Sequence, residues 1–191
     1  MADYKLASAY TGAEPITLDE AKDYLRVDFS NDNAYITSLI STSREMIEKD
    51  TNTAIVNRSY TEYLDGFPAD IIYLQVSGEI DGIPSINYMS QDSITHDKTL
   101  TLDTDFILGE FRGRPRLQSI TTWPTARELI GSVKIRYVIE PQIDIPLPLK
   151  QAMYMLISHF YDNRSAVSFL RAEEMPLGYR NIIRQYKNYI V

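Results

Sequence analysis

The stretch Thr17-Leu18-Asp19-Glu20-Ala21-Lys22-Asp23-Tyr24-Leu25-Arg26 sets the beginning of the fold. Its first four residues form a capping box, in which the threonine hydroxyl accepts from the glutamate backbone N–H and the glutamate carboxylate reaches back to the threonine N–H. Leu18, Ala21 and Leu25 follow at helical spacing. The stretch therefore predicts a short helix from about Leu18 to Arg26.

A second helix of about eighteen residues is indicated directly downstream. Asn31-Asp32-Asn33 offers side chains suited to an N-cap, and the polar run from Asp50 to Thr53 ends the helix. The charged residues Arg44, Glu45, Glu48 and Lys49 fall largely off its apolar face. Upstream, the first fifteen residues predict a mobile or strand-like arm that ends at Pro15. The expected apolar face comprises Tyr35, Ile36, Leu39, Ile40, Ser43, Met46 and Ile47.

The middle of the chain changes to a period of two, which is typical of strands. Asp65-Gly66-Phe67-Pro68 is a turn, and His96-Asp97-Lys98 has the composition of a hairpin tip. Such closely spaced short strands indicate a small antiparallel sheet or a barrel-like layer. The expected strands are 59–64, 71–74, 83–89, 93–95, 99–102, 105–108, 117–120 and 132–139.

Helical spacing returns after Pro146, with Pro148 in a first turn that tolerates proline. This third helix is expected to reach about Asn163. Pro176-Leu177-Gly178 then introduces a last helix from Tyr179 to Ile190. The predicted order is therefore two helices, a β region and two helices, without an internal repeat.

Composition and charge exclude several classes of protein. The chain has 191 residues, 44% hydrophobic and 24% charged, which suits one soluble globular domain. It has no cysteine, so disulfides, thiolate metal sites and a cysteine nucleophile are excluded. No apolar run approaches the ~20 residues of a membrane helix, and residues 1–5 lack the pattern of a signal peptide.

The charge is distributed unevenly along the chain. Residues 1–53 carry −5, residues 54–146 carry −5 and residues 147–191 carry +3, giving a net charge of −7. This acidity argues against non-specific nucleic-acid binding over the whole surface. An acidic body with a basic C-terminal end is suited to contact copies of itself, or an acidic partner, through unlike charges. The alternative is that the uneven distribution of charge along the chain arose by chance and has no function.

Carboxylates and histidines offer few catalytic or metal-binding candidates. Asp103, Asp105 and Glu110 could form an acid–base group, but turn capping explains them better because no histidine, lysine or glycine-rich loop is nearby. His96 belongs to the expected hairpin tip, and His159 is interpreted as a helix-packing residue rather than a ligand. No zinc-binding, phosphate-loop, dinucleotide or nucleophile-elbow motif is present. We expect no catalytic residue, metal or cofactor.

Two basic segments have alternative interpretations. Arg112, Arg114 and Arg116 alternate, so they could line one face of a strand and contact phosphates, or they could lie in a solvated loop that pairs with acids. On the last helix, the tyrosines could pack in the core or anchor a partner, since tyrosine and arginine are enriched at interfaces. The two interpretations are compatible, because the tyrosine face of the helix can pack in the core while its basic face docks a partner. The candidate docking residues are Tyr179, Arg180, Ile183, Arg184, Tyr186, Lys187 and Tyr189.

Several motifs, in order along nearly the whole chain, resemble the head–tail connector family of tailed bacteriophages. This family, also called the head-completion or adaptor family, is shared with gene transfer agents. The opening resembles it in the Ile16-Thr17-Leu18 start, the Ala21-Lys22 pair and the Leu25 to Asp28 ending. The other matching segments are 32–51, Leu64 to Pro68, Trp123-Pro124, Pro148, Gln151-Ala152, His159 to Arg164, Met175 to Gly178 and Tyr186-Lys187.

The resemblance implies a non-enzymatic connector of the virion neck. It implies an α+β fold in which the N- and C-terminal helices form a bundle with a small inserted antiparallel β region. The whole chain would be one connector domain, with helices at about 17–52 and 147–190 and the β insertion at about 57–140.

The resemblance also implies partners. The protein would form a twelve-fold ring under the portal protein, extend the DNA channel without specific DNA binding, and dock a stopper or tail-completion protein. It would be located in the host cytoplasm during assembly and then in the virion, with no membrane. The open alternatives are another phage neck or tail-completion protein, a DNA-binding module and, more remotely, a carboxylate-dependent hydrolase.

Overall fold

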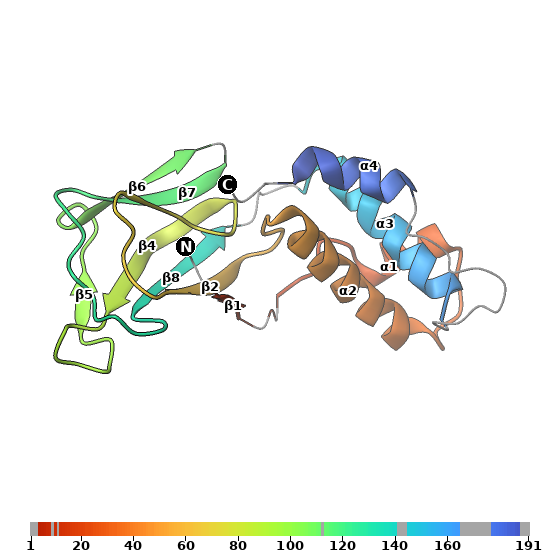
Figure 1. The fold of residues 1–191 in the computed structure, drawn as a ribbon. Helices are drawn as coiled ribbons and strands as arrows, with labels where there is room; N and C mark the ends of the chain where they lie inside the picture. The colour runs from red at the N-terminus through yellow and green to blue at the C-terminus, as the bar shows by residue number, and fades with distance from the viewer. Residues whose placement is uncertain are drawn as a thin grey trace. The chain divides into compact units, whose positions relative to one another are not determined.

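A computed structural model describes residues 4–8, 10, 12–111, 113–140, 145–164 and 177–187. The chain divides into two compact units. The described part of the β unit is drawn from residues 4–10 and 56–140, and that of the helical unit from residues 12–55 and 145–187. Both units are therefore built from segments that are distant in the sequence, as the colours of Figure 1 show.

The helical unit contains α1 (Leu18–Leu25), α2 (Asn33–Thr51), α3 (Leu147–Asp162) and α4 (Leu177–Tyr186). The predicted capping box is confirmed: the Thr17 N–H donates to the Glu20 carboxylate at 2.9 Å, and the Glu20 N–H donates to the Thr17 hydroxyl at 3.2 Å. The C-cap of α1 is Arg26, which adopts the left-handed conformation (φ 58°) common at helix C-termini. None of the described helices is both long and apolar enough to cross a bilayer.

Side-chain contacts fix the outer helices onto α2 and α3. The Lys150 Nζ lies 2.6 Å from a Glu20 carboxylate oxygen, and Tyr24 stacks on Tyr154 with ring centroids 4.8 Å apart, so α1 is held against α3. At the other end of α3, the Tyr161 hydroxyl donates to Asp32 at 2.6 Å. These contacts tie α1 and the N-terminal end of α2 to α3.

The core of the helical unit contains an ion cluster as well as apolar side chains. Arg44 is only 2% exposed, and its Nε lies 2.7 Å from a Glu14 oxygen while its Nη1 lies 2.9 Å from a Glu48 oxygen. Glu48 also accepts from the Ile55 backbone N–H at 2.9 Å. The helical pattern of the sequence places Arg44 and Glu48 largely off the apolar face of this helix, whereas the structure buries both.

The β unit contains two antiparallel sheets. The five-stranded sheet has the order β1-β2-β8-β4-β5, and the three-stranded sheet has the order β3-β7-β6. The N-terminal arm, predicted as mobile or strand-like, supplies the edge strand β1. The strands are β1 (Tyr4–Ala7), β2 (Arg58–Leu64), β3 (Ile71–Tyr73), β4 (Glu79–Tyr88), β5 (Lys98–Leu100), β6 (Phe106–Phe111), β7 (Arg114–Ser119) and β8 (Val133–Glu140).

Alternate residues of both sheets enclose one core. The inward positions of β2 include Glu62, which is fully buried and accepts hydrogen bonds from the Tyr137 hydroxyl on β8 and from the Gln75 backbone N–H at 2.7 Å. Since Gln75 follows β3, this carboxylate joins the two sheets. Burial beside Glu62 raises the pKa of Tyr137, so its hydroxyl stays protonated and donates. The apolar part of this core includes Leu64, Ile72, Leu74, Ile86, Phe106, Leu117, Ile135 and Ile139.

Aromatic and turn residues close one end of the β unit. The ring of Phe67 stacks on Trp123 at 5.1 Å, and the Trp123 indole N–H donates to the Asp70 carbonyl at 2.7 Å. The Asp65 carboxylate accepts from the Gly131 N–H at 2.7 Å. The turn at 65–68 and the tryptophan–proline pair, two separate motifs of the sequence, are thereby parts of one contact.

The prediction of a helical bundle with a small inserted β region is wrong. The β region is a unit of its own, with two antiparallel sheets and its own core. The physical reason is that the short strands bury residues on the facing sides of two sheets, which a single small layer could not do. β4 extends back to Glu79 through an irregularity at 81–85, and the expected strand at 93–95 is a turn region.

Candidate docking surface

The last helix presents two different faces. Tyr179 (2% exposed) and Ile183 (6% exposed) point into the helical unit. The Tyr179 hydroxyl donates to Asp50 at 2.7 Å, which ties α4 to the end of α2. Burial, followed by this hydrogen bond to a carboxylate, raises the pKa of Tyr179. These two candidate docking residues are therefore core residues of the helical unit.

The opposite face of α4 is basic and exposed. Arg180, Arg184 and Lys187 are all exposed, and Tyr186 is half-buried. Tyr189 lies outside the described residues. Because the inward face holds the helix in place, Arg180 and Arg184 are presented on a fixed element, and Lys187 directly follows the last residue of that helix.

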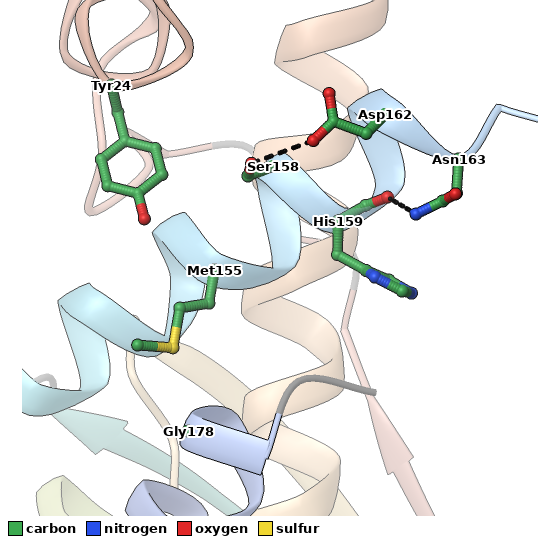
Figure 2. Close-up of a pocket in the computed structure, with 7 residues that line it drawn as sticks. All are labelled: Tyr24, Met155, Ser158, His159, Asp162, Asn163 and Gly178. Carbon is green, nitrogen blue, oxygen red and sulfur yellow. Dashed lines mark hydrogen bonds between the residues drawn. The ribbon is translucent and has the colours of Figure 1, made fainter. Parts of the chain in front are cut away.

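An open groove of about 500 Å³ runs along α3 beside the start of α4. Figure 2 shows Tyr24 of α1 on one side of α3 and Gly178 of α4 on the other. A side chain at position 178 would bring its Cβ to 3.2 Å from the Met155 Cε, so glycine allows this close approach. The groove is lined by Tyr24, Met155, Ser158, His159, Asp162, Asn163 and Gly178.

The polar groups of this groove make local helix contacts. The Ser158 hydroxyl lies 3.4 Å from the Asp162 carboxylate, a weak bond within one helical turn, and the Asn163 amide donates to the His159 carbonyl at 2.9 Å. The His159 ring packs edge-on against Phe160. No nucleophile, base and orienting group are brought together here, and no cluster of histidine and carboxylate ligands that could hold a metal occurs among the described residues.

The candidate carboxylates of the β unit cap turns. Asp105 accepts from the Thr101 N–H at 2.7 Å, and Glu110 accepts from the Gly113 N–H at 3.0 Å. Asp103 has φ 62° and lies in the turn between Thr101 and Asp105. The bonds of Asp105 and Glu110 support turn capping over acid–base chemistry.

The remaining candidates also have structural partners. A ring nitrogen of His96 lies 2.9 Å from the Gly131 carbonyl, which closes the same end of the β unit as the tryptophan. Arg114 and Arg116 lie on the strand β7 and not in a loop, while Arg112 lies outside the described residues. Arg114 donates to the Leu74 carbonyl at 3.1 Å.

Sequence reasoning missed one polar contact that joins distant segments. Arg164 lies over the rings of Tyr35 and Tyr161, 4.8 Å from each centroid, and pairs with Asp32 at 2.5 Å. The hydrogen bond from Tyr161, and then that from Arg164, lowers the pKa of Asp32. The spacing of Tyr161 and Arg164 on one helical side was a signal, but their partner lies more than 125 residues upstream.

Comparisons with known proteins agree with this fold. A sequence model of the family described as "Head completion protein" matches residues 14–189. A chain in the neck of an empty GTA particle, computed with C6 symmetry, superposes with a TM-score of 0.74 at 18% identity over 97% of each chain. A chain in the virion of a native gene transfer agent (GTA) particle superposes with a TM-score of 0.73, at the same identity and coverage. None of the curated proteins compared with the chain matches it.

The protein thus has a fold found in chains of gene transfer agent particles, built from a helical unit and a two-sheet β unit. The family match spans both units. The chain belongs to the head completion protein family.

Proposed function

We propose that the protein is a structural, non-enzymatic connector of the virion neck, which forms a ring under the portal of a tailed phage or gene transfer agent. The observation that carries this proposal is the family match over residues 14–189. The fold supports it, because chains of similar structure occur in GTA necks, one of them computed with C12 symmetry at a TM-score of 0.62 and 18% identity over 97% of each chain. A twelve-fold ring is the assembly that we propose for this chain.

In this proposal the two compact units act together as one connector domain. The helical unit binds the portal, and the ring offers another surface to a stopper or tail-completion protein. DNA passes through the ring without specific binding, since acidic side chains repel phosphate and do not retain it. The β segment, residues 54–146, carries thirteen acids against eight bases, which supports a wall of this kind.

The basic face of α4 is the proposed portal contact. Arg180, Arg184 and Lys187 can pair with acids on the portal, while Tyr179 and Ile183 keep the helix on the unit. Tyr186 is half-buried and lies at the margin of the same surface. Tyr189, beyond the described residues, belongs to the proposed surface from the sequence alone.

Charge reversal on α4 tests the portal contact. The variant Arg184→Glu/Lys187→Glu should fold normally and lose co-purification with portal rings. Any binding that remains should weaken less with added salt than that of the wild type, because fewer attractive charge pairs are left to screen. The matched control Lys22→Glu/Lys49→Glu makes the same change in net charge on α1 and α2 and should bind as the wild type does. Equal portal binding by all three proteins would contradict the α4 contact.

A further inference from the structure

The outward face of the three-stranded sheet combines arginines with exposed apolar side chains. Residues directly opposite each other in adjacent strands lie on one face, and Tyr73 is opposite Arg116 while Phe111 is opposite Arg114. Tyr73, Ile107 and Phe111 are 40%, 45% and 51% exposed. We call this surface the arginine face: Ile71, Tyr73, Ile107, Gly109, Phe111, Arg114, Arg116 and Gln118.

The arginines of this face are held in place by aromatic rings. The Arg114 guanidinium lies 5.6 Å from the Tyr73 centroid, and that of Arg116 lies 5.9 Å from the Phe111 centroid. The arginine face contains no carboxylate, and neither arginine pairs with an acid among the described residues. Arginine and aromatic residues on one rigid, part-exposed surface are typical of interface hot spots.

The five-stranded sheet carries the opposite charge on its own outward face. Glu79 of β4 is directly opposite Glu140 of β8, and Asp81 is opposite Val138. All three acids are exposed. We call Glu79, Asp81 and Glu140 the acidic face. Like charges directly opposite in a sheet repel, so this arrangement is unfavourable until a cationic partner covers it.

An exposed apolar side chain adjoins the acidic face. Ile83 is 75% exposed and follows Gly82, whose φ of 75° turns the strand at the irregularity in β4. The cations of the same outward face, Lys134 and Arg136, lie further along β8, opposite Asn87 and Ser85. The negative charge is therefore concentrated at the end of the sheet near Glu79.

The two faces match in spacing as well as in sign. Arg114 and Arg116 are two residues apart on one strand, and so are Glu79 and Asp81, which places each pair about 7 Å apart. The arginine pair stands beside three exposed apolar or aromatic side chains, and the acidic pair stands beside one, Ile83. Because the inner sides of the two sheets share one core, the two outward faces lie on opposite sides of that core within the β unit.

We propose that the arginine face of one copy binds the acidic face of the next copy. Such a contact joins two different surfaces, so it repeats head to tail and closes into a ring when the rotation allows. The contact would be the joint between subunits of the proposed ring, and in that respect it rests on the proposed function. Its occupant is a second copy of this chain.

Charge exchange tests this contact in the purified full chain. Sedimentation equilibrium up to millimolar protein should show self-association that weakens about tenfold or more in Arg116→Glu and in Glu79→Arg/Asp81→Arg. The combined variant, with both faces reversed, should recover association. Reversal of Asp92 and Glu128 to arginine makes the same charge change on exposed loops of this unit and should have no effect. Circular dichroism of each variant serves as the control for folding.

A cysteine pair gives a second measurement, because the wild-type chain has no cysteine. A mixture of Asp81→Cys and Arg116→Cys copies should form a disulfide-linked dimer under oxidation, far faster than either variant alone. The proposal would be overturned if the charge-reversed variants associate as the wild type does and the mixture forms disulfide-linked dimers no faster than either cysteine variant alone. Binding of a short DNA duplex that Arg116→Glu abolishes, without any effect on self-association, would also overturn it and assign the face to phosphates.

These outcomes are separable from those of the proposed function. Suppose that charge exchange abolishes and then restores self-association, but the chain is never found in necks. This result would support the contact and refute the neck role. If the chain is found in neck rings, and these rings form equally well when either face is reversed, the neck role would stand and the contact would be refuted.

Discussion

Replacing Arg44 by methionine should destabilise the helical unit strongly, because it leaves buried carboxylates without their cation. The guanidinium contacts Glu14 through two nitrogens, at 2.7 Å and 3.3 Å, and Glu48 at 2.9 Å. Glu48 is 8% exposed, so water cannot replace the lost partner fully. Removing one member of a buried ion pair costs about 3–5 kcal/mol. Glu14 is 20% exposed and can rehydrate in part, which favours the lower end, about 3 kcal/mol.

The assay is thermal and urea unfolding followed by circular dichroism at 222 nm, which reports mainly on the helices. A loss of about 3 kcal/mol corresponds to a fall in Tm of roughly 6–12 °C for a chain of this size. The only tryptophan, Trp123, lies in the β unit, so its fluorescence reports separately on that unit.

The double variant Arg44→Met/Glu48→Leu separates charge from packing. Replacing a buried pair by apolar side chains is often neutral, so this variant should be more stable than Arg44→Met alone by about 1 kcal/mol or more. A loss below about 1 kcal/mol in Arg44→Met, or no recovery in the double variant, would refute the view that the buried ion cluster stabilises this unit.

Three further predictions address a glycine with positive φ, the pH dependence of stability and the non-enzymatic role. Gly78→Ala should cost about 2–3 kcal/mol in urea unfolding, because φ is 139° and the new Cβ would lie 2.5 Å from an isoleucine methyl, whereas Gly66→Ala, with nothing within 4 Å, should be close to neutral. The pKa of Asp32 is lowered in the folded state, so its stabilising effect is present above the unfolded pKa of about 3.9 and is lost as the pH falls through the folded value; Asp32→Asn should flatten the acid side of the stability profile, and an unchanged profile would contradict this. Asp103→Asn/Asp105→Asn should leave particle assembly and DNA retention near wild type, while loss of a hydrolytic activity in a folded double variant would refute the non-enzymatic role.

Local signals predicted most elements of the fold. The capping box at Thr17 and the alternation of 132–139 depend on neighbours in the sequence, and the structure places α1 at Leu18–Leu25 and β8 at Val133–Glu140. The division into two units was not predicted, because it depends on which short strands face each other across a core. The helical bundle with a small β insertion was therefore the wrong architecture.

Buried charges were the other feature that sequence patterns did not show. A helical wheel treats Arg44 and Glu48 as polar and therefore external, but their burial depends on Glu14, thirty residues upstream of Arg44. Glu62 likewise sits on the inward side of β2, where alternation would place an apolar residue. On α4 the pattern identified both faces, and the structure shows that Tyr179 and Ile183 pack inward while the cations are exposed.

The most direct test of the central proposal is a cryo-electron microscopy reconstruction of the neck in particles that carry this chain. The proposal predicts twelve copies in one ring beneath the portal, with Arg180, Arg184 and Lys187 of each copy on the portal side. A single copy at the neck, or a ring that lies away from the portal, would contradict it.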